Sequence, residues 1–367
     1  MIDRHRILRF RMGAQQLDRS GGTPADTAVL DFGAQDTGPD GGRWALALRG
    51  VDVAAADHDE LVLLWTVRGA PHLYRREDVG RVATAVEPYS EADAAKRVFN
   101  ASKPLKSAGI GVLDALAEAA GRMRAIVTEP MTKGELSGRL AEELPEPYLR
   151  FCGPCGTVHM YEQPFRLAAS RAGLELAPGT SPPVLRPVPG FAKAAAEARF
   201  DLVRSYVRLL GPATPKHVAE FLDSPVKEVK AHWPEDAVEV GVEGPAGGER
   251  RWILAGDEAA LRSAEAEGTR LLGPYDLFLQ ARDRATLVPD PARAKELWPV
   301  LGRPGAVLVD GAIVGTWRPR KAGKKFTVLV RPWEGMSAPA REAVVEQAWR
   351  LARHRGVALT GVDFKAD

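Results

Sequence analysis

The side chains best suited to chemistry lie in the middle of the chain, where two cysteines are followed by a histidine. Cys152 and Cys155 have the spacing of a thioredoxin-type redox pair, and His159 follows four residues later. A redox pair needs a strand-helix-strand setting, and no such pattern surrounds these residues. A zinc site needs a fourth ligand or a second cysteine pair, which this stretch does not offer. We therefore interpret the segment as a tight turn, and predict neither a metal nor a cofactor.

A second group of candidate side chains is basic. Between residues 317 and 333 there are six Lys and Arg residues and no acidic residue, with a turn at Ala322-Gly323. Lys and Arg at a hairpin tip neutralise DNA phosphates and release counterions, which predicts salt-dependent DNA binding. The alternative is a charged turn that only improves solubility. The candidates here are Arg318, Arg320, Lys321, Lys324 and Lys325.

Weaker candidates for phosphate contacts occur elsewhere. They are Arg68, His72 and Arg75 around a hairpin turn, Lys103 and Lys106 in a loop, and Lys227 and Lys230 on a short helix. A solvated hairpin end or a plain linker would have the same composition. The short helix lacks the Arg, Asn and Gln set that reads base edges, so sequence-specific binding is not predicted. The sequence shows no Ser/His/Asp set, phosphate-binding loop or dinucleotide fingerprint.

Residues 201–255 indicate the scaffold that positions these side chains. Thr214 can cap a helix and Pro215 suits its first turn, so one helix ends and a second begins here. A third helical signal follows. Two strand-like runs, 237–242 and 250–255, are joined by a Gly-rich turn. Three helices and a two-stranded wing follow in the order of a winged helix-turn-helix, which presents a helix to the DNA major groove.

The same layout recurs 82 residues earlier, where Thr132 stands in the place of Thr214. Both threonines precede apolar residues at four and eight positions, although any two amphipathic helices can share that spacing. A hairpin over 61–74 ends a third unit near the N-terminus. We predict an α+β fold: three tandem winged helix-turn-helix units followed by a small C-terminal β-barrel-like domain. The boundaries are 1–100, 101–195, 196–268 and 269–367.

The C-terminal quarter has a different character from the rest. Asp310-Gly311 is typical of a tight hairpin turn. A closing amphipathic helix is predicted over 342–355. The short strands predicted here are 286–289, 306–309, 312–316 and 326–330.

Composition limits the class of protein. The chain has 367 residues, 45% of them hydrophobic, and a net charge of +2. That length provides two or three domains with cores of their own. No apolar run is long enough to span a bilayer, and no secretory signal is evident. Two cysteines fit a reducing cytoplasm, where we place the protein.

The pieces occur in the order found in the AlkZ-like DNA glycosylase family, which the chain resembles. Four passages carry the resemblance: 61–73, 211–230, 271–276 and 310–317. The resemblance implies three winged helices and a β-barrel arranged as a C around DNA. It also implies removal of alkylated bases, and some members unhook cross-links at N7-alkylguanine.

In that family the catalytic motif is Gln, an apolar residue and a second Gln, with His first or Asp last in variants. Gln35 matches the second polar position, and Gly33 stands where the first would be. An N7-alkylated guanine is already cationic and leaves without a general acid. An amide oxygen at Gln35 can then orient the water, and Asp36, if it points inward, can stabilise the sugar cation. The alternative is a loop in which both side chains fix a turn.

The leading hypothesis is a monomeric, metal-free DNA glycosylase acting on alkylated purines in double-stranded DNA. Because Gly33 replaces half of the catalytic pair, the second hypothesis is a non-catalytic winged-helix DNA-binding protein or transcriptional regulator. Thiol redox chemistry at Cys152 and Cys155 is a third. Substituting Gly33→Gln restores the family pattern and is expected to raise base release if Gln35 is correctly placed.

Overall fold

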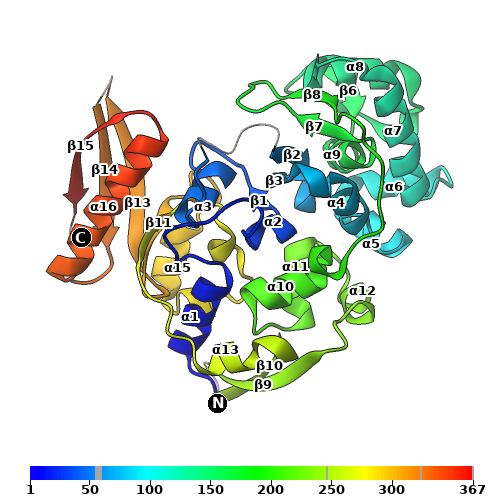
Figure 1. Ribbon diagram of the computed structural model, residues 1–367. Helices are drawn as coiled ribbons and strands as arrows, with labels where there is room; N and C mark the ends of the chain where they lie inside the picture. Colours follow the sequence, from blue (N-terminus) through cyan, green and yellow to red (C-terminus); the bar gives the residue numbers. More distant parts are fainter. Residues whose placement is uncertain (54–59, 245–246, 323–324, 366–367) are drawn as a thin grey trace. The chain divides into compact units, whose positions relative to one another are not determined.

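The computed structural model describes residues 1–53, 60–244, 247–322 and 325–365. Its contacts divide the chain into two compact units. Unit 1 comprises residues 1–56, 205–217 and 234–367, and unit 2 comprises 57–204 and 218–233. The division falls within helices α10 (Leu202–Leu210) and α11 (Pro215–Leu222), which Figure 1 shows with the other elements.

Unit 1 combines short helices with two sheets. Its N-terminal elements are α1 (Arg4–Ala14), α2 (Val29–Phe32), β1 (Ala34–Gln35) and α3 (Gly42–Leu48). The middle elements are β9 (Ala237–Gly244), β10 (Gly247–Leu254), η6 (Ala255–Asp257), α13 (Glu258–Arg262), β11 (Thr269–Leu272), η7 (Leu277–Gln280), α14 (Arg284–Leu287) and α15 (Pro291–Leu297). The chain continues with β12 (Gly305–Val309), β13 (Ala312–Ala322), β14 (Lys325–Pro332), α16 (Ala338–His354) and β15 (Ala358–Phe364).

The C-terminal sheet is five-stranded, in the order β11-β12-β13-β14-β15. Its pairs are antiparallel except the last, which is parallel. Helix α16 packs against β11 and β15 (Figure 1), and the sheet curls as a half-barrel with these strands at its edges. Phe326, Val328 and Val330 alternate along β14 with less buried residues, and Trp317 of β13, which pairs with Val330, is buried with them. The mixed α and β character predicted from the sequence is confirmed.

Most of the predicted C-terminal elements are present, with one error. The strands at 306–309, 312–316 and 326–330 and the closing helix are confirmed. At the turn, Asp310 and Gly311 have φ of 48° and 82°, the positive values that a tight hairpin requires. The strand predicted at 286–289 is wrong, because this stretch ends helix α14.

The N-terminal segment of unit 1 packs on the β9/β10 hairpin. Ile2 lies beside β9: its N–H donates to the carbonyl of Gly241 at 2.8 Å, and its carbonyl accepts from Glu243 at 3.0 Å. Side chains of α1, both strands and α13 share one core here. Its buried members are Ile2, Ile7, Phe10, Val240, Val242, Ile253 and Leu261.

Unit 2 contains the remaining elements. Those before residue 128 are β2 (Leu61–Trp65), η1 (Val67–Gly69), β3 (Pro71–Arg75), η2 (Arg76–Asp78), α4 (Val79–Ala85), α5 (Glu91–Arg97), η3 (Phe99–Ala101), α6 (Ser102–Ser107) and α7 (Val112–Ile126). The later ones are β4 (Met131–Thr132), α8 (Lys133–Glu143), η4 (Glu146–Tyr148), β5 (Leu149–Cys152), β6 (Thr157–Met160), α9 (Glu162–Arg171), β7 (Leu174–Leu176), β8 (Val184–Pro187), η5 (Ala198–Phe200) and α12 (Val226–Ala231).

Two small sheets organise unit 2. The hairpin predicted over 61–74 is confirmed as β2 paired with β3, and nearly all of its residues are buried. Strands β4, β8 and β7 form a second sheet in that order, so the short first strand lies beside the last. The core of the unit includes Val62, Leu64, Tyr74, Val82, Val188 and Phe200.

Both predicted threonine caps are present. The Thr132 hydroxyl accepts from the N–H of Glu135 at 3.2 Å, which begins α8. The Thr214 hydroxyl accepts from the N–H of His217 at 3.3 Å, which begins α11. Each bond satisfies one N–H that a helix start would otherwise leave unpaired.

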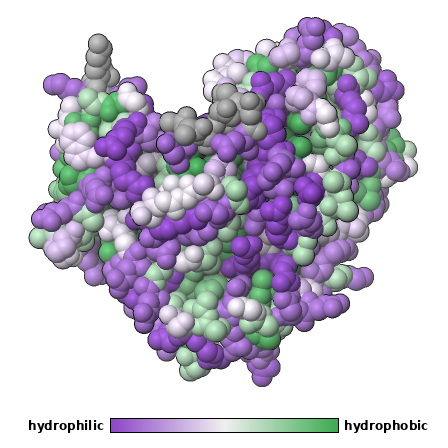
Figure 2. Space-filling model, in the orientation of Figure 1, coloured by the Kyte–Doolittle hydropathy of each residue, from purple (hydrophilic) through white to green (hydrophobic). Residues whose placement is uncertain are grey.

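Hydrophilic side chains predominate on the face of the molecule in Figure 2, with apolar residues scattered among them. Among the residues that the structure describes, no helix combines the length and apolar character needed to cross a bilayer.

Candidate active site and nucleic-acid interface

Gln35 belongs to a pair of hydrogen-bonded amides in unit 1. It lies on β1 and is half-buried. Its Oε1 accepts from the Nε2 of Gln280 at 3.0 Å, and its Nε2 donates to the hydroxyl of Thr37 at 3.0 Å. The Nε2 of Gln280 also donates to the carbonyl of Tyr275 at 3.2 Å. This chain of bonds fixes the orientation of the Gln35 amide.

A buried ion pair holds the segment that carries Gln280. Asp276 caps η7 by accepting from the N–H of Phe278 at 3.0 Å, so it sets where this short helix begins. Arg49 donates to both carboxylate oxygens of Asp276, at 2.8 and 3.0 Å, and both side chains are fully buried. A two-fold contact between guanidinium and carboxylate restricts orientation as well as distance. The pair therefore positions Gln280 through its helix.

The backbone at Gly273, three residues before Asp276, is packed too closely to accept a side chain. A Cβ at Gly273 would lie 2.1 Å from the carbonyl oxygen of Asp40, so only glycine fits. Next to it, the indole N–H of Trp44 donates to the carbonyl of Leu271 at 2.8 Å. The stretch 271–276 is one of the four passages that carry the family resemblance. It joins β11 to the amide pair through tight backbone contacts.

Asp36 supports the start of a helix. Its Oδ1 accepts from the N–H of Gly42 at 2.8 Å, at the start of α3. Burial raises the pKa of Asp36, against the opposing effects of the Gly42 N–H and the charge of Arg43. One carboxylate oxygen of Asp36 is thus engaged with the backbone of α3, and its stabilisation of the sugar cation stays a prediction.

Three arginines gather beside the amide pair, and sequence reasoning missed them. We call Arg282, Arg284 and Arg303 the arginine cluster. The guanidinium of Arg303 lies 5.3 Å from the ring centre of Tyr275, whose carbonyl binds Gln280. The pKa of Arg284 is lowered, first by the burial of part of its side chain and then by the positive charges of Arg282 and Arg303. Such a concentration of positive charge suits phosphate.

The cluster is anchored by a buried carboxylate, Asp283. It accepts from Arg11 at 2.7 and 3.0 Å and from Arg251 at 2.5 Å. Burial alone would raise the pKa of Asp283, but these two guanidiniums outweigh it and lower the pKa. Asp283, the one acidic residue of the segment 282–284, is therefore buried, whereas the Arg284 side chain is exposed.

Comparison with known proteins assigns the chain to a family. The model of the family described as DNA glycosylase AlkZ-like matches residues 11–354, which is most of the chain. The chain belongs to the AlkZ-like DNA glycosylase family. Membership places it among the DNA glycosylases, enzymes of DNA repair whose substrate is DNA.

A solved structure supports the same fold. The Streptomyces sahachiroi DNA glycosylase AlkZ matches with a TM-score of 0.72 and 19% sequence identity, over 98% of this chain and 99% of that chain. At this identity the likeness establishes the fold alone. A search of curated proteins gave no match.

Gly33, at the position of the first polar residue of the AlkZ-like motif, has a conformational role. It ends α2, and its N–H donates to the carbonyl of Val29 at 2.8 Å. Its φ is 97° and its ψ is 126°, a combination that residues with a Cβ rarely adopt. A glutamine could not occupy this backbone without strain.

Substituting Gly33→Gln is therefore expected to lower the free energy of unfolding by about 1–3 kcal/mol, the usual cost of such backbone strain. This revises the expectation that the substitution simply restores the family pattern. Denaturant unfolding measures the effect. Gly121→Gln is a control, because Gly121 lies in helix α7 with open space beside it. If Gly33→Gln is as stable as the control, the conformational argument is wrong.

Two predicted DNA contacts of this AlkZ-like protein, His72 and Arg75, are buried, which corrects the expectation for them, and a third, Arg68, is half-buried. His72 is buried against the Thr66 hydroxyl at 3.0 Å, and burial, aided by nearby Arg68, lowers its pKa to about 3. Arg75 is buried beside Asp78. Arg68 donates to the carbonyl of Phe221 at 2.9 Å. Neutral or internally paired groups of this kind are not placed to contact phosphate.

Four predicted contacts in unit 2 are on its surface. Lys103 and Lys106 are exposed on α6, a short helix where the sequence predicted a loop. Lys227 and Lys230 are exposed on α12, three residues apart. All four side chains are accessible to solvent, so they stay among the predicted DNA contacts.

The basic hairpin of the C-terminal sheet is also exposed, and its register sorts the side chains by face. Arg318, Arg320, Lys321 and Lys325 are all exposed, and Lys324 lies outside the described residues. Arg320 pairs with Thr327, whereas Lys321 pairs with the buried Phe326. Because side chains alternate along a strand, Arg318 and Arg320 share the face opposite the buried one.

Proposed function

We propose that the protein is a monofunctional DNA glycosylase that hydrolyses the N-glycosidic bond of alkylated purines, with N7-alkylguanine as the leading substrate. The observation that carries this proposal is the Gln35 amide, whose oxygen accepts from the Nε2 of Gln280 at 3.0 Å. We extend the proposal to cross-links formed through the same guanine nitrogen. The chemical step uses no cofactor.

The chemistry follows from the charge on the damaged base. Alkylation at N7 makes guanine a cationic leaving group, so the bond breaks without a proton donor. The remaining task is to place water and to stabilise a sugar that becomes positively charged. An amide oxygen with a fixed direction can both place the water and face the cationic sugar. Its effect is weaker than that of a carboxylate, but it does not depend on the pKa of a side chain. Gln280 fixes that direction.

We infer that the protein contains tandem winged helices. Helix α7, strand β4, helices α8 and α9 and strands β7 and β8 follow in this order, with β4 beside β8. Helices α10, α11 and α12 and strands β9 and β10 repeat it, with Ala213 as the short strand beside Trp252 of β10. This order is typical of the winged helix-turn-helix.

The proposed DNA contacts combine the arginine cluster with basic residues elsewhere in the chain. Arginine is suited to phosphate because its planar group donates two parallel hydrogen bonds. The proposed set outside the cluster comprises Lys103, Lys106, Lys227, Lys230, Arg318, Arg320, Lys321, Lys324 and Lys325. We propose that the protein acts as a cytoplasmic monomer on damaged double-stranded DNA.

A second candidate function is DNA binding without catalysis, as in a regulator. Gly33 favours it, because half of the AlkZ-like catalytic motif is replaced by a residue that the backbone requires. The two candidates differ in one observable, the release of a free base.

The test is incubation with duplex DNA containing one N7-methylguanine, followed by chromatography of the released base. Wild-type protein is expected to release it, and Gln35→Ala to lower the rate by about 10²-fold or more, the usual effect of losing a group that positions the attacking water. Gln163→Ala, another half-buried glutamine whose Nε2 donates to a backbone carbonyl, is the matched control.

Two results would contradict the proposal. Equal rates for wild type and Gln35→Ala would remove Gln35 from the chemistry. Tight binding to undamaged duplex with no base release would favour the non-catalytic alternative.

A further inference from the structure

The β5/β6 hairpin of unit 2 brings together every cysteine of the chain and one histidine. The chain has two cysteines, Cys152 and Cys155. In the hairpin, Arg150 pairs with His159, so the two side chains share one face. Cys152 lies two residues beyond Arg150 and therefore projects from that face too. The strand register alone places Cys152 and His159 together.

The turn of the hairpin directs Cys155 toward the same point. Residues 153–156 form a tight turn in which the N–H of Gly156 donates to the carbonyl of Cys152 at 2.9 Å. Gly156 has a φ of 64°, which suits glycine. The Cys155 sulfur lies within 4.8 Å of the Cys152 sulfur and of a His159 ring nitrogen.

His159 is oriented as a metal ligand usually is. Its Nδ1 lies 2.8 Å from the carbonyl of Met160, which can only accept, so Nδ1 carries the proton. The lone pair is therefore on Nε2. A metal-binding histidine typically donates its other N–H to a carbonyl or carboxylate, which fixes the ring and the tautomer.

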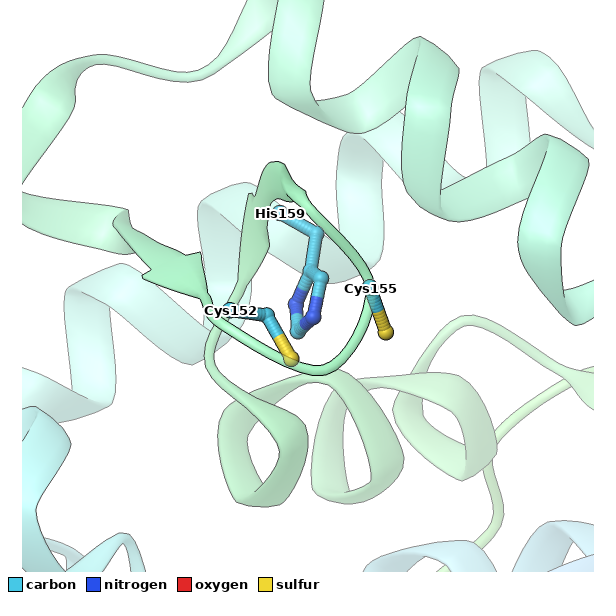
Figure 3. A group of neighbouring side chains, drawn as sticks. All are labelled: Cys152, Cys155 and His159. Carbon is cyan, nitrogen blue, oxygen red and sulfur yellow. The ribbon is translucent and has the colours of Figure 1, made fainter.

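The three donor atoms are close enough to share one ion. The two sulfurs and a ring nitrogen all lie within 4.8 Å of one another, and Figure 3 shows the three side chains on the same hairpin tip. Tetrahedral zinc, with Zn–S near 2.3 Å and Zn–N near 2.0 Å, holds its ligand atoms about 3.5–3.8 Å apart. Small side-chain rotations would close the remaining gap.

We propose that Cys152, Cys155 and His159 bind one zinc ion, with water in the fourth position. Binding releases the thiol protons to solvent: Zn²⁺ replaces one proton on each cysteine, and no electrons are transferred. Thiolate sulfur and imidazole nitrogen are donors that bind zinc, whereas magnesium and calcium take oxygen ligands. No metal was predicted from the sequence, because a fourth protein ligand was required. A disulfide would use only the cysteines, whereas the oriented His159 supplies a third donor.

The ion would stabilise a hairpin with little core of its own. The hairpin lies between α8 and α9 in sequence, and on the face opposite the metal ligands Phe151 and Val158 are 69% and 47% exposed. Few apolar contacts therefore hold its tip. Cross-linking the two strands at Cys152 and His159 substitutes for packing there.

The experiment uses untagged full-length protein, stripped with chelator and kept reduced. Titration with Co²⁺, a spectroscopic substitute for zinc, is expected to give thiolate charge-transfer bands that saturate at one ion per chain. Zinc is expected to displace cobalt, to raise the Tm and to slow alkylation of both cysteines at least tenfold. Cys152→Ser and His159→Ala are each expected to weaken zinc binding at least tenfold.

His5→Ala is the matched control, because His5 is an exposed histidine in unit 1, and it should bind zinc as wild type does. The proposal is overturned if cobalt gives no thiolate bands, if zinc leaves cysteine alkylation unchanged, or if His159→Ala retains wild-type affinity. The test needs no DNA, so its outcome is independent of the proposed glycosylase activity.

Discussion

Replacing Asp276 with alanine is expected to lower the free energy of unfolding by about 3–5 kcal/mol, because Arg49 would remain buried without its partner. Both side chains are fully buried, and two hydrogen bonds join them. The cap of η7 would be lost as well, so Gln280 would no longer be held against Gln35. Denaturant unfolding measures the loss, and base release by the folded fraction is expected to fall.

Glu258→Ala provides the comparison. Glu258 also pairs with an arginine, Arg262, but on the surface of α13, where both side chains are more than a third exposed. Exposed pairs contribute less than about 1 kcal/mol. Similar losses for Asp276→Ala and Glu258→Ala would show that the Arg49–Asp276 pair does not hold this region together.

Removing two members of the arginine cluster, by Arg284→Ala with Arg303→Ala, is expected to weaken duplex DNA binding roughly 10- to 100-fold at low salt. Each phosphate contact contributes about 0.9 to the slope of log affinity against log salt, so the slope should fall by about two. Fluorescence anisotropy over a salt series measures both quantities. Lysine at both positions should largely restore the slope.

A control for net charge is available in unit 2. Arg122 and Arg139 are exposed. Arg122 pairs with Glu118 of α7 and Glu143 of α8, and Arg139 pairs with Glu135 of α8. Replacing both with alanine removes the same charge as the cluster variant but should leave the salt slope unchanged. An unchanged slope in the Arg284/Arg303 variant would instead exclude the cluster from DNA binding.

Local patterns were sufficient to predict most elements. The hairpin over 61–74, the helix after Thr214 and the turn at Asp310-Gly311 depend on short-range chemistry, such as caps and positive φ, that neighbouring residues determine. The strand predicted at 286–289 failed for the converse reason. Its apolar residues are buried by the rest of unit 1, and a short apolar run does not distinguish helix from strand.

The candidate site was harder to predict, because its parts come from distant segments. Gln280 is 245 residues from Gln35, and no periodicity links them. The contacts predicted at His72 and Arg75 failed because β3 is buried along nearly its whole length. Alternation shows which residues share a face of a strand, but not whether both faces are covered.

Asp283 has a consequence for the energetics of recognition. Its carboxylate is clamped by Arg11 and Arg251, and its peptide backbone is continuous with that of Arg282 and Arg284. Ordering a loop on binding costs entropy. Because Asp283 ties this segment to the core, the backbone of Arg282 and Arg284 is already ordered, and phosphate binding by the proposed cluster would carry no such cost for the main chain. Loss of this one interior contact would therefore weaken the proposed binding as well as the fold.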